Sequence, residues 1–94
     1  MSEEKFPEGP LPVHETVKVL EYTTIYKTQK WWKAVALVNM FGHDKIVTYL
    51  WRMDDKTGRW RRKQKMGINN EDEWTKVMQA HEKYMSKLTV IRHG

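Results

Sequence analysis

The apolar residues of this chain change their spacing near residue 70, and this change predicts the order of its secondary structure. Before that point, β-branched and aromatic residues gather in runs in which alternate positions are apolar, as in strands with one buried face. After it, apolar residues recur at intervals of three and four, as on one face of a helix. We therefore expect strands first and a single helix last.

Four runs predict strands, over residues 16–28, 31–41, 46–53 and 59–68. In the third run Val47, Tyr49 and Trp51 alternate on one face. Turn signals separate the last three runs: Gly42 lies in residues 39–44, and Gly58 ends the polar stretch 54–58. No proline follows Pro12, so these strands can donate a full set of backbone hydrogen bonds. We expect a meander of four antiparallel strands.

The helix is predicted over residues 71–87. Asn70 is its natural N-cap, and Glu73 stands three residues later, in the capping-box position. Asp72 and Lys76 have the i, i+4 spacing of a helical ion pair. The apolar face consists of Trp74, Val77, Met78, His81, Met85 and Leu88.

These elements define an α+β fold, a four-stranded antiparallel sheet followed by one amphipathic C-terminal helix. We expect a flexible, acidic and proline-rich tail over residues 1–13, one domain over residues 14–89 and a second tail over residues 90–94. One helix leaves a sheet face uncovered unless a second chain covers it, and so small a domain gains stability from self-association. We therefore expect a homodimer, with the apolar helix face as its candidate interface.

The charge of the chain is concentrated in the predicted sheet. The whole sequence holds 17 Lys and Arg against 12 Asp and Glu, a formal charge of +5. Between residues 18 and 66 there are 12 basic and 4 acidic side chains. A basic block in an otherwise acidic chain is typical of a surface that binds a polyanion. The alternative is a solvated charged surface.

The fourth predicted strand carries five Lys and Arg among residues 59–65. In a regular strand, one face presents Arg59, Arg61, Lys63 and Lys65, and the other presents Trp60, Arg62, Gln64 and Met66. A row of like charges repels itself, and phosphates lying along the strand would relieve that repulsion. The alternative is an edge strand that is charged to prevent aggregation.

Aromatic residues lie among these basic residues. Trp31 and Trp32 stand between Lys30 and Lys33, and in a regular strand the two rings face opposite sides, so one can be core and the other exposed. An exposed ring flanked by lysines suits stacking of an unpaired base, worth about 1–3 kcal/mol, whereas a duplex hides its base faces. The alternative is that most of these rings are core. The candidate nucleic-acid-binding residues are Lys30, Trp31, Trp32, Lys33, Tyr49, Trp51, Arg52, Arg59, Trp60, Arg61, Arg62, Lys63 and Lys65.

No catalytic residue, metal site or cofactor is expected. The four histidines are scattered without metal-ligand spacing, and the chain has no cysteine and no glycine-rich phosphate loop. No segment approaches the roughly 20 apolar residues of a membrane span. The absence of cysteine fits an intracellular protein, either cytoplasmic and nucleoid-associated or nuclear.

One junction resembles a known family. Lys65-Met66-Gly67-Ile68, then a short polar turn and Trp74, resembles the strand-to-helix junction of the Whirly-like positive cofactor four family of transcriptional coactivators. The basic, tryptophan-rich character is also similar to the ThermoDBP family of archaeal single-stranded-DNA binders. The resemblance covers about residues 17–88.

This resemblance implies a curved sheet, a homodimer built through the helices and single-stranded DNA on the sheet surfaces. By position, Lys63 and Lys65 match the basic end of the family's last strand, and Trp74 matches a packing aromatic. The chain departs from the family in its doubled Trp31-Trp32 and in the density of basic residues after Trp60.

We therefore expect non-enzymatic, largely sequence-independent binding of single-stranded DNA, with phosphates on Lys and Arg and bases on Trp and Tyr. Binding of RNA or duplex DNA is one alternative. Another is a transcription-cofactor-like or structural module that recruits an acidic protein partner.

Overall fold

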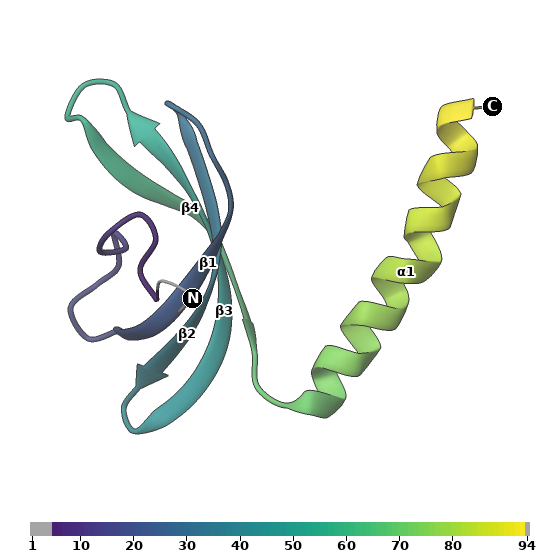
Figure 1. The fold of residues 1–94 in the computed structure, drawn as a ribbon, viewed down its shortest axis with the longest axis horizontal. Helices are drawn as coiled ribbons and strands as arrows, with labels where there is room; N and C mark the ends of the chain where they lie inside the picture. The colour runs from purple at the N-terminus through teal and green to yellow at the C-terminus, as the bar shows by residue number, and fades with distance from the viewer. Residues whose placement is uncertain (1–4, 94) are drawn as a thin grey trace.

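The computed structural model describes residues 5–93 and contains the predicted order of elements (Figure 1). Strands β1 (Lys18–Lys27), β2 (Trp31–Met40), β3 (His43–Asp54) and β4 (Arg59–Ile68) are followed by helix α1 (Glu71–His93). Each strand pairs antiparallel with the next one in the chain, so that the sheet order is β1-β2-β3-β4. The predicted fold class is confirmed: an open, curved antiparallel sheet is followed by one C-terminal helix.

The core lies on one side of this sheet. Along β2, Trp32, Ala34, Ala36 and Val38 are buried, and the residues between them are half-buried. The buried residues of β3 are Val47, Tyr49 and Trp51, which alternate as predicted. The small alanines leave room for the large rings, and the Trp32 and Trp51 centroids lie 5.0 Å apart. We call this side, which bears Trp32, Tyr49 and Trp51, the covered face, and the opposite side the open face.

The N-terminal segment, residues 5–17, packs on the covered face (Figure 1). Leu11 is buried there, and the Tyr22 hydroxyl of β1 donates to the Gly9 carbonyl and accepts from the Glu8 N–H, each at 2.7 Å. The segment thus differs from the flexible tail expected over residues 1–13, of which residues 1–4 lie outside the described residues. The physical reason is that no helix covers this face, so the segment supplies the second layer that the core needs.

Three irregularities interrupt the pairing of the strands. The β1–β2 register shifts between Val19 and Glu21 and again between Thr24 and Tyr26. The β3–β4 register shifts between Leu50 and Trp51, because Lys63 is an extra residue on β4. Each extra residue bends its strand and increases the local twist, which curls the sheet around its core.

The bulge at Lys63 makes the predicted faces of β4 wrong. Trp51 pairs with Arg62 and Tyr49 pairs with Lys65, so both cations lie on the covered face. Arg61 pairs with Arg52 on the open face, where Gln64 and Met66 also lie. The regular alternation that would place Lys65 with Arg59, Arg61 and Lys63 is broken because one inserted residue inverts the faces of every residue after it.

Helix α1 begins as predicted but does not cover the sheet. The Asn70 side chain accepts a hydrogen bond from the Glu73 N–H at 2.8 Å, and Lys76 pairs with Asp72 at 3.4 Å. Among the described elements α1 contacts β4 alone, and it extends away from the sheet (Figure 1). None of the helices described has the length and apolar character needed to cross a membrane.

The helix ends at His93 rather than near residue 87. The expected tail over residues 90–94 is therefore helical as far as His93, and Gly94 lies outside the described residues. Between Lys87 and His93 the sequence has neither glycine nor proline to end a helix, and the first such residue is Gly94.

The β2–β3 turn contains a strained residue that can be relieved by substitution. Phe41 and Gly42 have φ of 53° and 83°, as in a two-residue type I′ hairpin, and Phe41 is 82% exposed. Phe41→Asn should stabilise the protein by about 1 kcal/mol, because asparagine tolerates the left-handed conformation and little packing is lost. The melting temperature should rise by about 4–8 °C in calorimetry. Gly42→Ala, the control, should lower it, and an unchanged value for Phe41→Asn would contradict the strain.

Candidate nucleic-acid interface

Cross-strand pairing arranges the open face in rows that run across β2, β3 and β4. One end row joins Trp31, Arg52 and Arg61, and the opposite end row joins Leu37, Ile46 and Ile68. Paired residues point to the same face of a sheet and lie close together. The open face is therefore basic at one end and apolar at the other.

The basic end is built around one indole. The guanidinium carbon of Arg52 lies 5.3 Å from the ring centroid of Trp31, which is half-buried. Lys63, in the bulge, lines one groove with Arg52 and Arg61 and a second groove with Lys33. We call Trp31, Lys33, Arg52, Arg61 and Lys63 the basic end. A cation over an indole face is attracted by the ring. Arg52 is therefore held against Trp31, and the other cations of the basic end surround this ring.

Asp54 positions one of these cations. Its carboxylate lies 3.2 Å from Nε of Arg61, whose side chain is 69% exposed. The same carboxylate accepts the Lys56 N–H at 3.0 Å. The pKa of Asp54 lies below its ordinary value, chiefly because of the Lys56 N–H, with further lowering by Thr57 and Arg61. The β3–β4 turn thus holds an ionised carboxylate beside Arg61.

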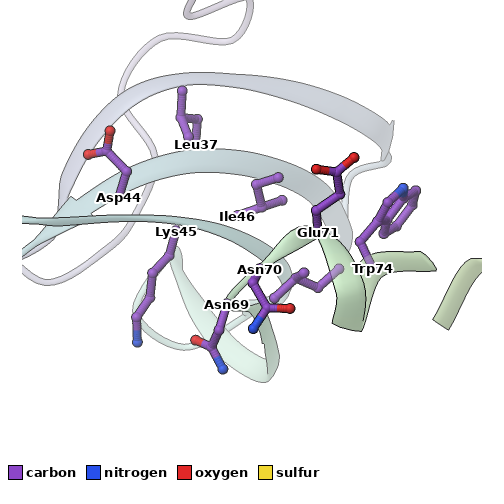
Figure 2. A pocket seen from close by; sticks show the side chains of 9 residues that line it. Leu37, Asp44, Lys45, Ile46, Asn69, Asn70, Glu71 and Trp74 are labelled. Carbon is purple, nitrogen blue, oxygen red and sulfur yellow. The ribbon is translucent and has the colours of Figure 1, made fainter. Parts of the chain in front are cut away.

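The apolar end contains a cavity of about 270 Å³ where α1 leaves the sheet (Figure 2). Leu37 and Ile46 stand on the sheet, and Glu71 and Trp74 reach the cavity from the first turn of α1. Trp74 is 46% exposed. An apolar cavity beside a half-exposed indole is suited to burying a further apolar group.

The rest of the predicted dimer interface lies along α1. Met78, Met85 and Leu88 are exposed by 37%, 57% and 54%. Val77 is half-buried, and Nδ1 of the exposed His81 donates to the Val77 carbonyl at 2.8 Å. The apolar face of the helix is therefore turned away from the core of its own chain.

The predicted binding residues are divided between the two faces of the sheet. On the covered face lie Trp32, Tyr49, Trp51, Trp60, Arg62 and Lys65; on the open face lie Trp31, Lys33, Arg52, Arg59, Arg61 and Lys63. Lys30 is exposed in the β1–β2 turn, where its carbonyl accepts the Met53 N–H at 2.8 Å. The thirteen residues therefore do not form one site.

Burial separates the aromatic residues further. Trp32, Tyr49 and Trp51 are at most 2% exposed, so their rings offer no surface to a base in this conformation. Trp60 is half-buried and packs edge-on against Trp32 at 5.6 Å. As predicted, the neighbouring Trp31 and Trp32 face opposite sides, which leaves Trp31 as the one ring of the predicted set that lies on the open face.

Two features were absent from the sequence-based set. Lys27 places its ammonium 4.2 Å from the Trp32 ring centroid on the covered face and lies 3.8 Å from the carboxylate of Glu8. The apolar end of the open face, around Leu37 and Ile46, was also missed. Its signal was present, because Val35 and Leu37 are apolar residues on the open side of β2, as in a strand that is covered on both sides.

Within residues 5–93, no group of three His, Cys, Asp or Glu side chains lies close enough to hold a metal ion. Comparisons with protein-family models, with curated proteins and with solved structures find no match for this chain.

The lowered pKa of Asp54 predicts how stability depends on pH. A carboxyl with a lower pKa in the folded state stabilises the fold above its unfolded pKa, about 3.9, and loses this effect as pH falls through the folded value. The Asp54→Asn variant should therefore be less stable than the wild type at pH 6, and the two should converge as the pH falls below the folded pKa of Asp54. Urea unfolding at several pH values measures this.

Asp55→Asn is the matched control, since it removes the same charge from the same turn but leaves the carboxylate that contacts Lys56 and Arg61. A difference between Asp54→Asn and the wild type that persists unchanged at low pH would contradict the electrostatic explanation.

Proposed function

We propose that this chain binds single-stranded DNA without catalysis and with little sequence preference, through the basic end of its open face. One observation carries the proposal: a half-buried indole, Trp31, with the Arg52 guanidinium over it, stands in one row with Arg61. Lys33 and Lys63 flank this row. Within the described chain, the N-terminal segment packs on the other face, and the basic end remains accessible.

The chemistry of this row suits a single strand. A base stacked on Trp31 would extend the ring contact that Arg52 begins, and stacking tolerates any base. The neighbouring phosphates would meet cations from three strands. A duplex could offer only its phosphates to this surface, because its base faces are hidden. RNA remains the alternative ligand, since both kinds of single strand present open bases.

The family resemblance agrees with this function in part. Lys63 matches a basic residue late in the family's last strand. It is also one of the residues of the basic end of the open face. Lys65, which matches the same region, lies on the covered face beside Tyr49. A strand bound as we propose would contact Lys63, and Lys65 also lines the groove that Lys63 shares with Lys33.

We also propose that two copies associate through α1 and the apolar end of the open face. The cavity beside Trp74 and the exposed Met78 and Leu88 support this, because a monomer leaves all of them in water. A second copy could cover this apolar surface with the apolar face of its own helix. Recruitment of a different protein by the same surface is the alternative.

Binding is tested by tryptophan fluorescence during titration with a mixed-sequence single strand and with its duplex. We expect the single strand to quench fluorescence more strongly, because a base stacks on Trp31. Trp31→Ala should weaken binding about tenfold, the effect of losing one stacked base. Four cations of the basic end predict a log–log salt slope of about −3, from about −0.7 for each phosphate.

Lys76→Gln is the control, because it removes one positive charge from α1, far from the proposed contacts. If Trp31→Ala bound as tightly as the wild type, Trp31 would not be the stacking ring. A salt slope near zero would contradict the phosphate contacts, and equal binding of the duplex would favour a purely electrostatic surface.

Self-association is tested by sedimentation equilibrium. We expect a dimer for the wild type and a monomer for Met78→Lys, because a charge on the apolar helix face cannot be buried without a partner. The far-ultraviolet circular dichroism should be unchanged, since Met78 is part of an exposed helix surface. A monomeric wild type would exclude the homodimer and would favour recruitment of a different protein by the same surface.

A further inference from the structure

A second candidate site lies on the covered face, opposite the basic end. It is a cavity of about 250 Å³ between the N-terminal segment and strands β3 and β4. Its lining residues are Pro12, Val13, His14, Val17, Tyr49, Trp51, Arg62 and Lys65. Because Arg62 pairs with Trp51 and Lys65 pairs with Tyr49, each cation stands beside one of the two rings. The lining contains two permanent cations and no carboxylate.

Two buried polar atoms beside this cavity lack a partner. Among the described residues, neither the Tyr49 hydroxyl nor Nε1 of Trp51 makes a hydrogen bond, although both side chains are at least 98% buried. The two rings are stacked with centroids 5.1 Å apart. Buried polar groups almost always have partners, so two unpartnered groups on adjacent rings point to a ligand that both could reach.

Charge in the cavity is equally unbalanced. Arg61, on the open face, pairs with Asp54, whereas neither Arg62 nor Lys65 makes an ion pair within residues 5–93. Burial raises the pKa of the Tyr49 hydroxyl, and Arg62 opposes this effect. The hydroxyl is therefore protonated at neutral pH and can donate. The residues around the cavity thus carry an ammonium, a guanidinium, a phenol O–H and an indole N–H.

His14 of the N-terminal segment also lines the cavity. Its Nδ1 contacts the Thr16 hydroxyl at 2.9 Å and the Thr16 N–H at 3.2 Å. A polar ring therefore faces the cavity from the N-terminal segment, in addition to the polar groups of the sheet. A ligand that accepted from both sides would join the segment to the sheet.

We infer that this cavity is a binding site for a phosphate monoester group. Such a group is largely dianionic at neutral pH, which matches the two cations, and its three terminal oxygens accept several hydrogen bonds. Arginine binds phosphate through two parallel hydrogen bonds, which suits Arg62. A carboxylate brings one charge and two oxygens, so one cation would remain unpaired. The group could belong to a free nucleotide or to the end of a strand.

The N-terminal segment can admit this ligand without disrupting the sheet. Around the cavity its backbone hydrogen bonds are local, from Val13 N–H to the Leu11 carbonyl and from Val17 N–H to the His14 carbonyl, each 2.9 Å long. The unpartnered atoms of Tyr49 and Trp51 are closed off from water, so a local rearrangement must accompany their contact with a ligand. The site does not depend on the proposed function, because the two surfaces lie on opposite faces of the sheet.

The indole N–H of Trp51 is the reporter in the test. The full chain labelled with ¹⁵N is titrated with sodium phosphate, with sodium acetate and with sodium chloride at matched ionic strength. We expect the Trp51 indole signal to move with phosphate alone, because a new acceptor reaches its N–H. Arg62→Gln should weaken phosphate binding about tenfold, the effect of losing one charge-assisted contact.

Arg61→Gln is the matched control, since it removes the same charge from the neighbouring residue on the opposite face. It should leave phosphate binding unchanged while it weakens binding of a 5′-hydroxyl oligonucleotide. A nucleoside 5′-monophosphate and a 5′-phosphorylated oligonucleotide then identify the source of the group. Tighter binding of the first assigns a free nucleotide, and tighter binding of the second assigns a strand end.

The site is excluded if the Trp51 signal does not move, if acetate moves it as phosphate does, or if Arg61→Gln and Arg62→Gln weaken phosphate binding equally. Failure of the two proposals is distinguishable. Phosphate binding without oligonucleotide binding would remove only the proposed function, and oligonucleotide binding without any movement of the Trp51 signal in phosphate would remove only this site.

Discussion

The packing of Trp32, Tyr49 and Trp51 over Ala34 and Ala36 is the interaction on which the rest of this structure depends. A single sheet has no core until a second layer covers it. Here α1 extends away, so the rings themselves, closed by the N-terminal segment around Leu11, form that layer. Because this packing uses one face of the sheet for stability, only the opposite face offers an accessible aromatic platform.

The bulge at Lys63 then distributes the cations. Without it, Arg59, Arg61, Lys63 and Lys65 would form one row on the open face. With it, Lys65 joins Arg62 beside the rings of the core, while Arg61 faces the open surface beside Trp31. Adjacent arginines thus serve opposite surfaces, and the charge that looks like one feature in the sequence becomes two sites of different chemistry. In our proposals the basic end of the open face binds a flexible strand, and the cavity of the covered face binds a single compact anion.

Local rules were enough to predict the elements. Alternation predicted the buried residues of β3, Asn70 predicted the start of α1, and Gly42 predicted the β2–β3 turn. The faces of β4 could not be predicted, because a bulge is decided by the partner strand and leaves no mark in the residues that contain it. Leu11 was read as part of a tail because its neighbours are prolines, although a proline-rich segment without strands can still pack through one apolar side chain. The bulge moves Lys65 to the covered face, and the other predicted binding residues divide between the two faces by ordinary strand alternation.

Because the open face is basic at one end and apolar at the other, it could contact nucleic acid at the first end and a second copy of the chain at the other. Trp31 and Leu37 lie in the end rows of β2, six residues apart, which in a strand is about 20 Å. In the proposed arrangement a second copy covers the row of Leu37 and leaves the row of Trp31 to the nucleic acid. Each copy would then keep its basic end free, and the two ends would belong to one assembly. A strand long enough to reach both would bind the second end at a high effective concentration, so the apolar end would strengthen binding without touching the nucleic acid.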